Sequence, residues 1–204
     1  MGENFNMADF EEYMRDGQVD HPPALYEDYK STVLRSPSRK AVRLEHTLSE
    51  ITGPIYGHGP ILEGEDDLSI VEGEEAQGQR IFVSGQVLDE NGKAVPNTLI
   101  EIWQCNAAGR YRHEVDQHPA PLDPNFVGGG RVVTDDRGSY KFTTIKPGAY
   151  PWGNHHNAWR PAHIHFSLFG PAFVTRLITQ MYFPGDPLFP FDPIYNSIPN
   201  EKAR

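Results

Sequence analysis

The sequence predicts an all-β protein, specifically a β-sandwich with long loops and an irregular amino-terminal arm. Gly 19 and Pro 18 among 204 residues indicate many turns and few long helices. From Gln79 onward, several runs alternate apolar and polar residues with the period of a half-buried strand. A chain of this length can form one such domain and carry an extended arm.

The predicted strands form two pairs, followed by two further runs. Residues 80–104, RIFVSGQVLDENGKAVPNTLIEIWQ, predict a first pair around a turn rich in Asp, Asn, Gly and Pro. Residues 131–145, RVVTDDRGSYKFTTI, predict a second pair around an Asp-Asp-Arg-Gly turn. The runs HIHFSLF (163–169) and RLITQMYF (176–183) bring the total to at least six strands, as in a sandwich.

Residues 1–79 are predicted to form the arm and residues 80–204 the sandwich domain. In the arm, MADFEEYMRD (7–16) is one short helical possibility, and the acidic passage 63–79 is predicted to be a solvated loop. Because the arm has so little periodicity, we expect it to become ordered by packing on the body or on a partner subunit.

Charge and composition exclude several classes of partner. The net charge of -10, with no local basic cluster, argues against binding to nucleic acid. No apolar run reaches the roughly 18 residues that a membrane span needs. The single cysteine, Cys105, rules out an internal disulfide and fits a reducing compartment, and the acidic opening residues do not resemble a signal peptide. We therefore expect a cytoplasmic enzyme or binding protein.

The strand HIHFSLF carries His163 and His165 two positions apart, so both imidazoles point to the same face. Ile164 and Phe166 point to the other face. Such a pair can bind zinc, copper, iron or nickel, or can be two strand histidines that bond to neighbouring polar groups. Residues 146–180 contain no Asp or Glu, so a carboxylate ligand is absent nearby. Spacing alone leaves the metal open.

Four long blocks of the chain resemble the intradiol ring-cleaving dioxygenases, in particular the β subunits of those that act on protocatechuate. The blocks occur in the family's order, and the arm residues HPPALYEDYKSTVLRSP and LSEITGP extend the similarity to most of the chain. The blocks are NTLIEIWQCNAAGRYRHEVDQHPAPLDPNF, TIKPGAYPWGN, WRPAHIHFSLFGP and LITQMYFPGDPL.

The resemblance implies a mononuclear non-haem Fe(III) held by Tyr111, Tyr150, His163 and His165, with a solvent-derived hydroxide. Spacing cannot select two ligands from nine tyrosines, so this choice rests on the resemblance. Two phenolates are hard anionic donors that favour ferric iron. The tyrosine matching Tyr150 is expected to yield to a chelating catecholate and to accept one of its protons.

The resemblance also assigns residues to the substrate. Arg160 is expected to lie against the aromatic ring and to stabilise negative charge that develops on it; the alternative is an arginine in an ordinary ion pair. Gln180 is expected near the iron and substrate pocket, or facing water from its strand. Trp152 and, in the arm, Tyr29 are expected to line the pocket, whereas Trp103 fits packing and recognition equally well.

The implied reaction opens protocatechuate with O2 to 3-carboxy-cis,cis-muconate, a step of aromatic catabolism through the β-ketoadipate pathway. A related α subunit is the expected partner in a hetero-oligomer. The family's last strand is expected to be missing after NSIPNEKAR, and the doubled His155 and His156 depart from the family pattern. The alternatives are cleavage of catechol, hydroxyquinol or a sulfocatechol, a non-catalytic transthyretin-like module, or an iron-free scaffolding subunit.

Overall fold

The computed structural model describes residues 22–39, 60–89, 91–170 and 176–204. The chain divides into two compact units, and each is described by itself. The sandwich unit comprises His46–Tyr150 and Pro161–Gly185, and the small unit comprises Met1–Glu45, Pro151–Arg160 and Asp186–Arg204.

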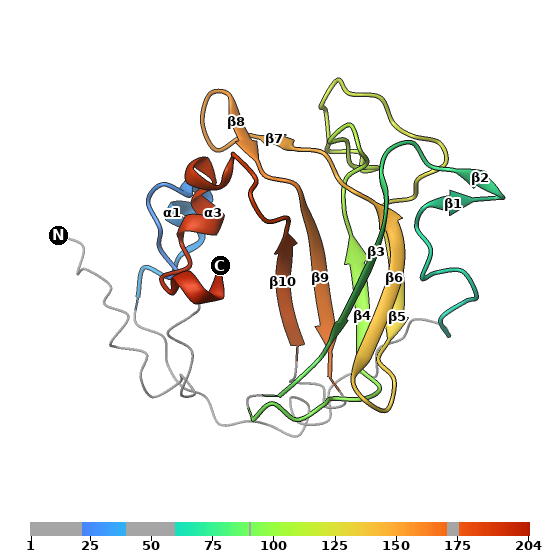
Figure 1. Cartoon of the computed structure of the whole chain (residues 1–204). Helices are drawn as coiled ribbons and strands as arrows, with labels where there is room; N and C mark the ends of the chain where they lie inside the picture. The colour runs from blue at the N-terminus through green and yellow to red at the C-terminus, as the bar shows by residue number, and fades with distance from the viewer. Residues whose placement is uncertain (1–21, 40–59, 90, 171–175) are drawn as a thin grey trace. The chain divides into compact units, whose positions relative to one another are not determined.

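The sandwich unit is built from a four-stranded antiparallel sheet and a two-stranded antiparallel sheet (Figure 1). The four-stranded sheet has the order β10-β9-β4-β5, and the second sheet pairs β3 with β6. The strands are β3 (Arg80–Gln86), β4 (Leu99–Trp103), β5 (Gly129–Val133), β6 (Ser139–Ile145), β9 (His163–Phe169) and β10 (Arg176–Tyr182).

The two sheets bury a shared apolar core, which confirms the predicted sandwich. Phe166 of β9 contacts the rings of Tyr140 and Phe142 on β6, with centroids 6.0 and 5.9 Å apart. Ile164 is fully buried two residues before Phe166, and Ile100 of β4 is equally buried. The apolar face of each strand therefore points between the layers, as the alternation predicts.

The strands themselves were predictable, but both predicted hairpins are wrong. β3 pairs with β6, and β4 pairs with β5 and β9, so the two runs of residues 80–104 lie in different sheets. The same holds for β5 and β6. The turns do form: the N–H of Val95 donates to Val87 O (3.0 Å) and that of Asp135 to Ser139 O (2.9 Å). Each turn reverses the chain and carries it from one layer to the other.

The acidic passage 63–79 is more ordered than the predicted solvated loop. Leu68 and Ser69 are each only 1% exposed, and Leu68 belongs to the core. The Arg131 guanidinium binds the Glu65 carboxylate at 2.6 Å and thereby lowers the pKa of that carboxyl. The passage also contains a two-stranded antiparallel hairpin, formed by β1 (Ile70–Val71) and β2 (Glu74–Glu75).

The small unit contains short helices rather than a sheet core. Its helical elements are α1 (Lys30–Arg35), η3 (Phe189–Phe191), α3 (Pro193–Asn196) and η4 (Glu201–Ala203). β7 (Tyr150–Trp152) and β8 (Ala158–Arg160) form a two-stranded sheet. Asp192 caps α3 by accepting a hydrogen bond from the Ile194 N–H at 3.0 Å.

Some sequence predictions lie outside what the structure describes. The short helix predicted at 7–16 falls on residues that are not described. The boundary between an arm and a domain at residues 79 and 80 stays a prediction. No helix in the described ranges has both the length and the apolar character needed to cross a membrane.

Truncating the core should cost far more stability than truncating the sheet's exposed surface. Ile100 is 0% exposed, so Ile100→Ala should lower the free energy of unfolding by about 2–5 kcal/mol through lost burial and a cavity. Ile178→Ala is the matched control, because Ile178 is 66% exposed. Equal losses for the two variants in denaturant unfolding would contradict the assignment of the core.

Candidate active site

One face of β9 carries the two histidines, and the neighbouring strands place further side chains beside them. His165 lies opposite Trp103 of β4 and Gln180 of β10, and His163 lies opposite Tyr182 of β10. Directly opposed residues in an antiparallel sheet share a face. The strand period thus directs both imidazoles away from the core, as the sequence predicts.

Tyr111, from the loop after β4, meets both histidines. Its Oη lies 3.4 Å from His163 Nε2 and 3.2 Å from His165 Nε2. The ring of Tyr150 meets that of Tyr111 edge-on, with centroids 4.8 Å apart. All four residues that the resemblance assigns to the metal are therefore gathered in the sandwich unit.

Tyr111 Oη is spaced from each imidazole Nε2 as two ligands of one ion would be. Two donors that share an ion with bonds of about 2.0–2.1 Å lie roughly 3–3.5 Å apart. Both separations from Tyr111 Oη fall within that range. Two phenols and two imidazoles are also a donor set suited to iron. The spacing of Tyr111, His163 and His165, with the Tyr150 ring beside them, therefore fits residues that could hold one iron ion.

The tautomer of His163 is fixed by the backbone. Its Nδ1 lies 2.7 Å from the carbonyl oxygen of Pro161, and a carbonyl only accepts hydrogen bonds. Nδ1 therefore carries a proton, which leaves Nε2, the nitrogen that faces Tyr111, as the atom able to offer a lone pair to a metal. His163 is 1% exposed, so water does not compete for this bond. A bond of this kind is how proteins orient metal-binding imidazoles.

Asp116, which the sequence analysis missed, holds the backbone of Tyr111. Its Oδ2 accepts a hydrogen bond from the Tyr111 N–H at 2.7 Å, and its Oδ1 accepts from the His118 N–H at 2.8 Å. Asp116 is 7% exposed and lies 3.9 Å from the Arg110 guanidinium. The spacing of carboxylate and tyrosine in the loop RYRHEVDQH gives no periodic signal for this contact.

Three predicted substrate residues come together in the small unit. The rings of Tyr29 and Trp152 lie 5.4 Å apart, and the Arg160 guanidinium carbon lies 5.5 Å from the Trp152 ring. Arg160 also forms an ion pair with Asp192, with Nη2 and Oδ2 3.0 Å apart. The ion pair considered as the alternative for Arg160 therefore exists, and it fixes the guanidinium beside Trp152.

The remaining candidates have clear positions. Gln180 is half-buried, and its Oε1 accepts a hydrogen bond from the Tyr182 hydroxyl at 2.9 Å. Trp103 is 45% exposed and packs on both Tyr111 and His165, at 4.5 and 5.1 Å between centroids. His155 and His156 are exposed in the loop between β7 and β8.

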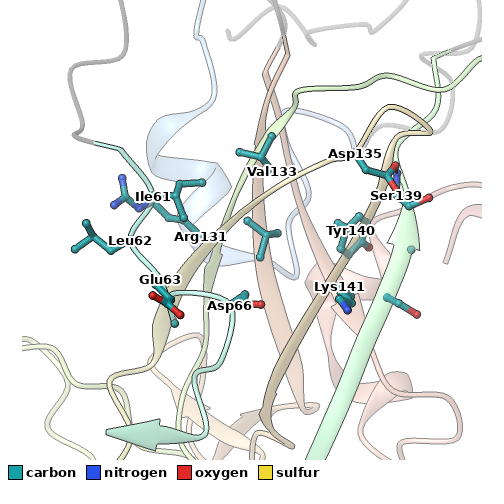
Figure 2. A pocket seen from close by; sticks show the side chains of 14 residues that line it. Ile61, Leu62, Glu63, Asp66, Arg131, Val133, Asp135, Ser139, Tyr140 and Lys141 are labelled. Carbon is teal, nitrogen blue, oxygen red and sulfur yellow. Dashed lines mark hydrogen bonds between the residues drawn. The ribbon is translucent and has the colours of Figure 1, made fainter. Parts of the chain in front are cut away.

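A cavity of about 740 Å³ lies elsewhere in the sandwich unit (Figure 2). It is lined by residues of β3, β5 and β6 together with the segment 61–66, among them Arg131, Tyr140 and Lys141. None of the predicted site residues lines it. This cavity is thus separate from the tyrosine and histidine cluster.

Cys105 precedes the Tyr111 loop, and its thiol is unreactive. It is 1% exposed, and burial raises the pKa of its thiol from 9.0 to about 12. Its Sγ donates weakly to the carbonyl of Gly148 at 3.5 Å. A neutral buried thiol is neither a nucleophile nor a metal ligand, so Cys105 belongs to the packing beneath the site.

Comparison with known proteins defines the class. Residues 51–203 match the family model described as "Dioxygenase". Because that match covers most of the chain, the chain belongs to this family, the intradiol ring-cleaving dioxygenases, whose members generally use non-haem iron. Residues 13–47 match the model described as "Protocatechuate 3,4-dioxygenase beta subunit N terminal".

Two individual relatives show which members of the family the chain is similar to, and how far. The chain is 58% identical over 186 residues to a protocatechuate 3,4-dioxygenase beta chain of Burkholderia cepacia, covering 90% of this chain and 79% of that one. It is 32% identical to a catechol 1,2-dioxygenase of Candida albicans, covering 80% of this chain and 56% of the relative. The recognised resemblance is confirmed, and the enzyme interpretation is favoured over the transthyretin-like module.

Solved structures agree on the fold. The 3-chlorocatechol 1,2-dioxygenase of Rhodococcus opacus matches with a TM-score of 0.55 at 26% identity, covering 71% of this chain and 59% of that one. The catechol 1,2-dioxygenase of Pseudomonas arvilla matches with a TM-score of 0.53 at 28% identity, covering 73% and 50%. The chain thus spans about half to three fifths of the length of these catechol-cleaving relatives.

The buried thiol predicts a pH dependence of stability. The folded thiol stays neutral up to about pH 12, whereas an unfolded one ionises near 9.0, so its contribution is complete below pH 9.0 and is lost as the pH rises from there toward 12. The difference in free energy of unfolding between wild type and Cys105→Ala should therefore fall by about 1.4 kcal/mol per pH unit above that point. A difference that stays constant to about pH 11 would contradict the buried, neutral thiol.

Breaking the buried ion pair should destabilise the small unit. The Arg160 and Asp192 side chains are 6% and 0% exposed, so Asp192→Ala leaves a buried charge without its carboxylate and should cost about 3–5 kcal/mol in denaturant unfolding. Arg137→Ala, which removes an exposed pair with Asp135, is the control and should change stability little. Similar effects for both variants would show that the Arg160 pair is not buried in solution.

Proposed function

We propose that the chain is the catalytic β subunit of an Fe(III)-dependent intradiol dioxygenase that opens protocatechuate between its two hydroxylated carbons. Both atoms of O2 enter the product, 3-carboxy-cis,cis-muconate, in aromatic catabolism through the β-ketoadipate pathway. The observation that carries the proposal is the position of Tyr111 Oη within 3.4 Å of both imidazole Nε2 atoms, beside Tyr150. The 58% identity to a protocatechuate 3,4-dioxygenase beta chain supports this substrate.

In this proposal Tyr111, Tyr150, His163 and His165 hold the metal. A ferric ion held there would supply Lewis acidity that activates a catechol ring toward O2. His163 contributes its Nε2 lone pair because its Nδ1 proton is committed to Pro161. The Tyr150 phenolate is the base proposed to take a proton from a substrate hydroxyl.

Arg160, Trp152 and Tyr29 are the proposed substrate-binding residues of the small unit. The ion pair with Asp192 and the contact with the Trp152 ring restrict the guanidinium to one orientation. A fixed cation needs no reorganisation to stabilise negative charge that develops on the ring. Gln180 is proposed as a hydrogen-bonding group of the pocket, itself oriented by the Tyr182 hydroxyl.

We also propose a related α subunit as partner in a hetero-oligomer, and a cytoplasmic location. The beta-chain similarity and the matching amino-terminal model support the partner. The fit of residues 13–47 to a model specific to that subunit type supports protocatechuate over catechol, hydroxyquinol or a sulfocatechol as substrate. Oxygen uptake by the assembled protein on these substrates, measured side by side, ranks them.

The ligand assignment is tested by colour. Phenolate bound to ferric iron absorbs visible light, so the iron-loaded protein should be red to burgundy, and Tyr150→Phe should weaken or shift the band. Tyr140→Phe is the control, because Tyr140 packs in the core against Phe166. A Tyr150→Phe protein with the wild-type spectrum, or a colourless wild type, would refute the ligand set.

A further inference from the structure

The two tyrosine-bearing segments are joined by a pair of interlocked turns. Tyr111 follows the turn 106–110, and Tyr150 follows the turn 146–149. The first turn closes when the Asn106 N–H donates to Arg110 O at 2.9 Å and the Gly109 N–H donates to Asn106 O at 3.0 Å. The same Asn106 carbonyl accepts a hydrogen bond from the Gly148 N–H at 3.0 Å, which ties the second turn to the first.

The side chain of Asn106 completes this arrangement. Its Oδ1 accepts hydrogen bonds from the N–H groups of Ala108 (3.0 Å) and Arg110 (2.9 Å). Its Nδ2 donates to the carbonyl of Pro121 at 2.9 Å, in the segment that follows the loop. Asn106 is 5% exposed, so these bonds are shielded from water. These three contacts need a side-chain amide, because it carries an acceptor oxygen and a donor nitrogen together.

Two glycines allow the turns to approach this closely. A Cβ on Gly109 would lie 2.1 Å from the Ala149 carbonyl oxygen, and one on Gly148 would lie 2.5 Å from the Ala107 carbonyl oxygen. Gly109 also has a φ of +76°, a conformation that costs other residues energy. The backbones of the two turns are thus in direct contact, immediately before each tyrosine.

We infer that Asn106 is a positioning residue that sets the spacing between the Tyr111 and Tyr150 phenols. The inference rests on the proposed function, because the spacing matters only if both phenols bind one ion. Asn106 acts through its hydrogen bonds to the backbone turns that carry the two rings. Its contacts hold the Tyr111 turn by the side chain and the Tyr150 turn by the carbonyl, so the edge-on ring contact is fixed before any metal arrives.

The test compares Asn106→Ala with the matched control Asn154→Ala. Asn154 is 6% exposed and likewise bonds two backbone groups, the Lys30 N–H and the Asp28 carbonyl, but in the small unit. Each full-length variant is loaded with Fe(III), its visible charge-transfer band is recorded, and its affinity for Fe(III) is measured by competition with a chelator. Far-ultraviolet circular dichroism and a thermal melt establish that each variant is folded.

Asn106→Ala should weaken or shift the band and lower the affinity for Fe(III) by about 10- to 100-fold, the range for residues that orient metal ligands. Asn154→Ala should leave both unchanged. The conservative Asn106→Asp keeps the acceptor for Ala108 and Arg110 and should restore most of the band. A folded Asn106→Ala protein with the wild-type band and affinity overturns the inference.

A second variant keeps the inference testable if Asn106→Ala does not fold. Gly148→Ala leaves the side chain of Asn106 intact but forces the two turns apart, so it should cause the same kind of change in the band. A wild-type band in folded Gly148→Ala would overturn the inference. A wild-type protein without any visible band would overturn the proposed function, and with it this inference, whereas a coloured wild type with unchanged variants overturns the inference alone.

Discussion

The alternation of side chains along β9 is the constraint on which both the core and the site depend. Ile164 and Phe166 point between the sheets and are at most 5% exposed, while His163 and His165 point to the other face. Burying the first pair fixes the register of the strand, because a slip of one residue would exchange the two faces. The packing of Ile164 and Phe166 in the core thus fixes where the two imidazoles lie on the opposite face of the strand.

The proposed ligand set has a second requirement, which is that two loops bring the Tyr111 and Tyr150 rings together beside that face. A sheet positions residues within a strand, but Tyr111 lies beyond the end of β4 and Tyr150 lies at the start of the short β7. Outside the sheet, hydrogen bonds position these residues. Asp116 accepts a hydrogen bond from the Tyr111 N–H, and the Asn106 carbonyl joins the two turns. Buried polar networks of this kind are rigid only when their members are satisfied, which explains the many backbone contacts around Asn106.

Prediction from sequence succeeded where a feature depends on local periodicity. The strand His163–Phe169 has the predicted limits, and the same-face geometry of its histidines follows from the strand period alone. The pairing of strands failed, because turn residues report that the chain reverses and not which sheet each strand joins. Leu68 shows the same limit: its acidic neighbours predict a solvated loop, but Leu68 inserts into the core and Glu65 pairs with Arg131, contacts that leave no periodic pattern in the sequence.

In the candidate site too, some residues could be predicted from the sequence and others could not. Nothing in the spacing of nine tyrosines singles out Tyr111 and Tyr150; their selection came from the family resemblance, and the structure then brought their rings together. Asn106, Asp116 and Asp192 went unrecognised because their partners are single backbone groups or a distant arginine, and such contacts leave no pattern in the sequence.

The central claim is that two tyrosines and two histidines bind one iron ion, and its most direct measurement is anomalous diffraction at the iron edge from crystals of the iron-loaded protein. We predict one peak bonded to Tyr111, Tyr150, His163 and His165; a peak elsewhere, or one that lacks a bond to either tyrosine, would contradict the account.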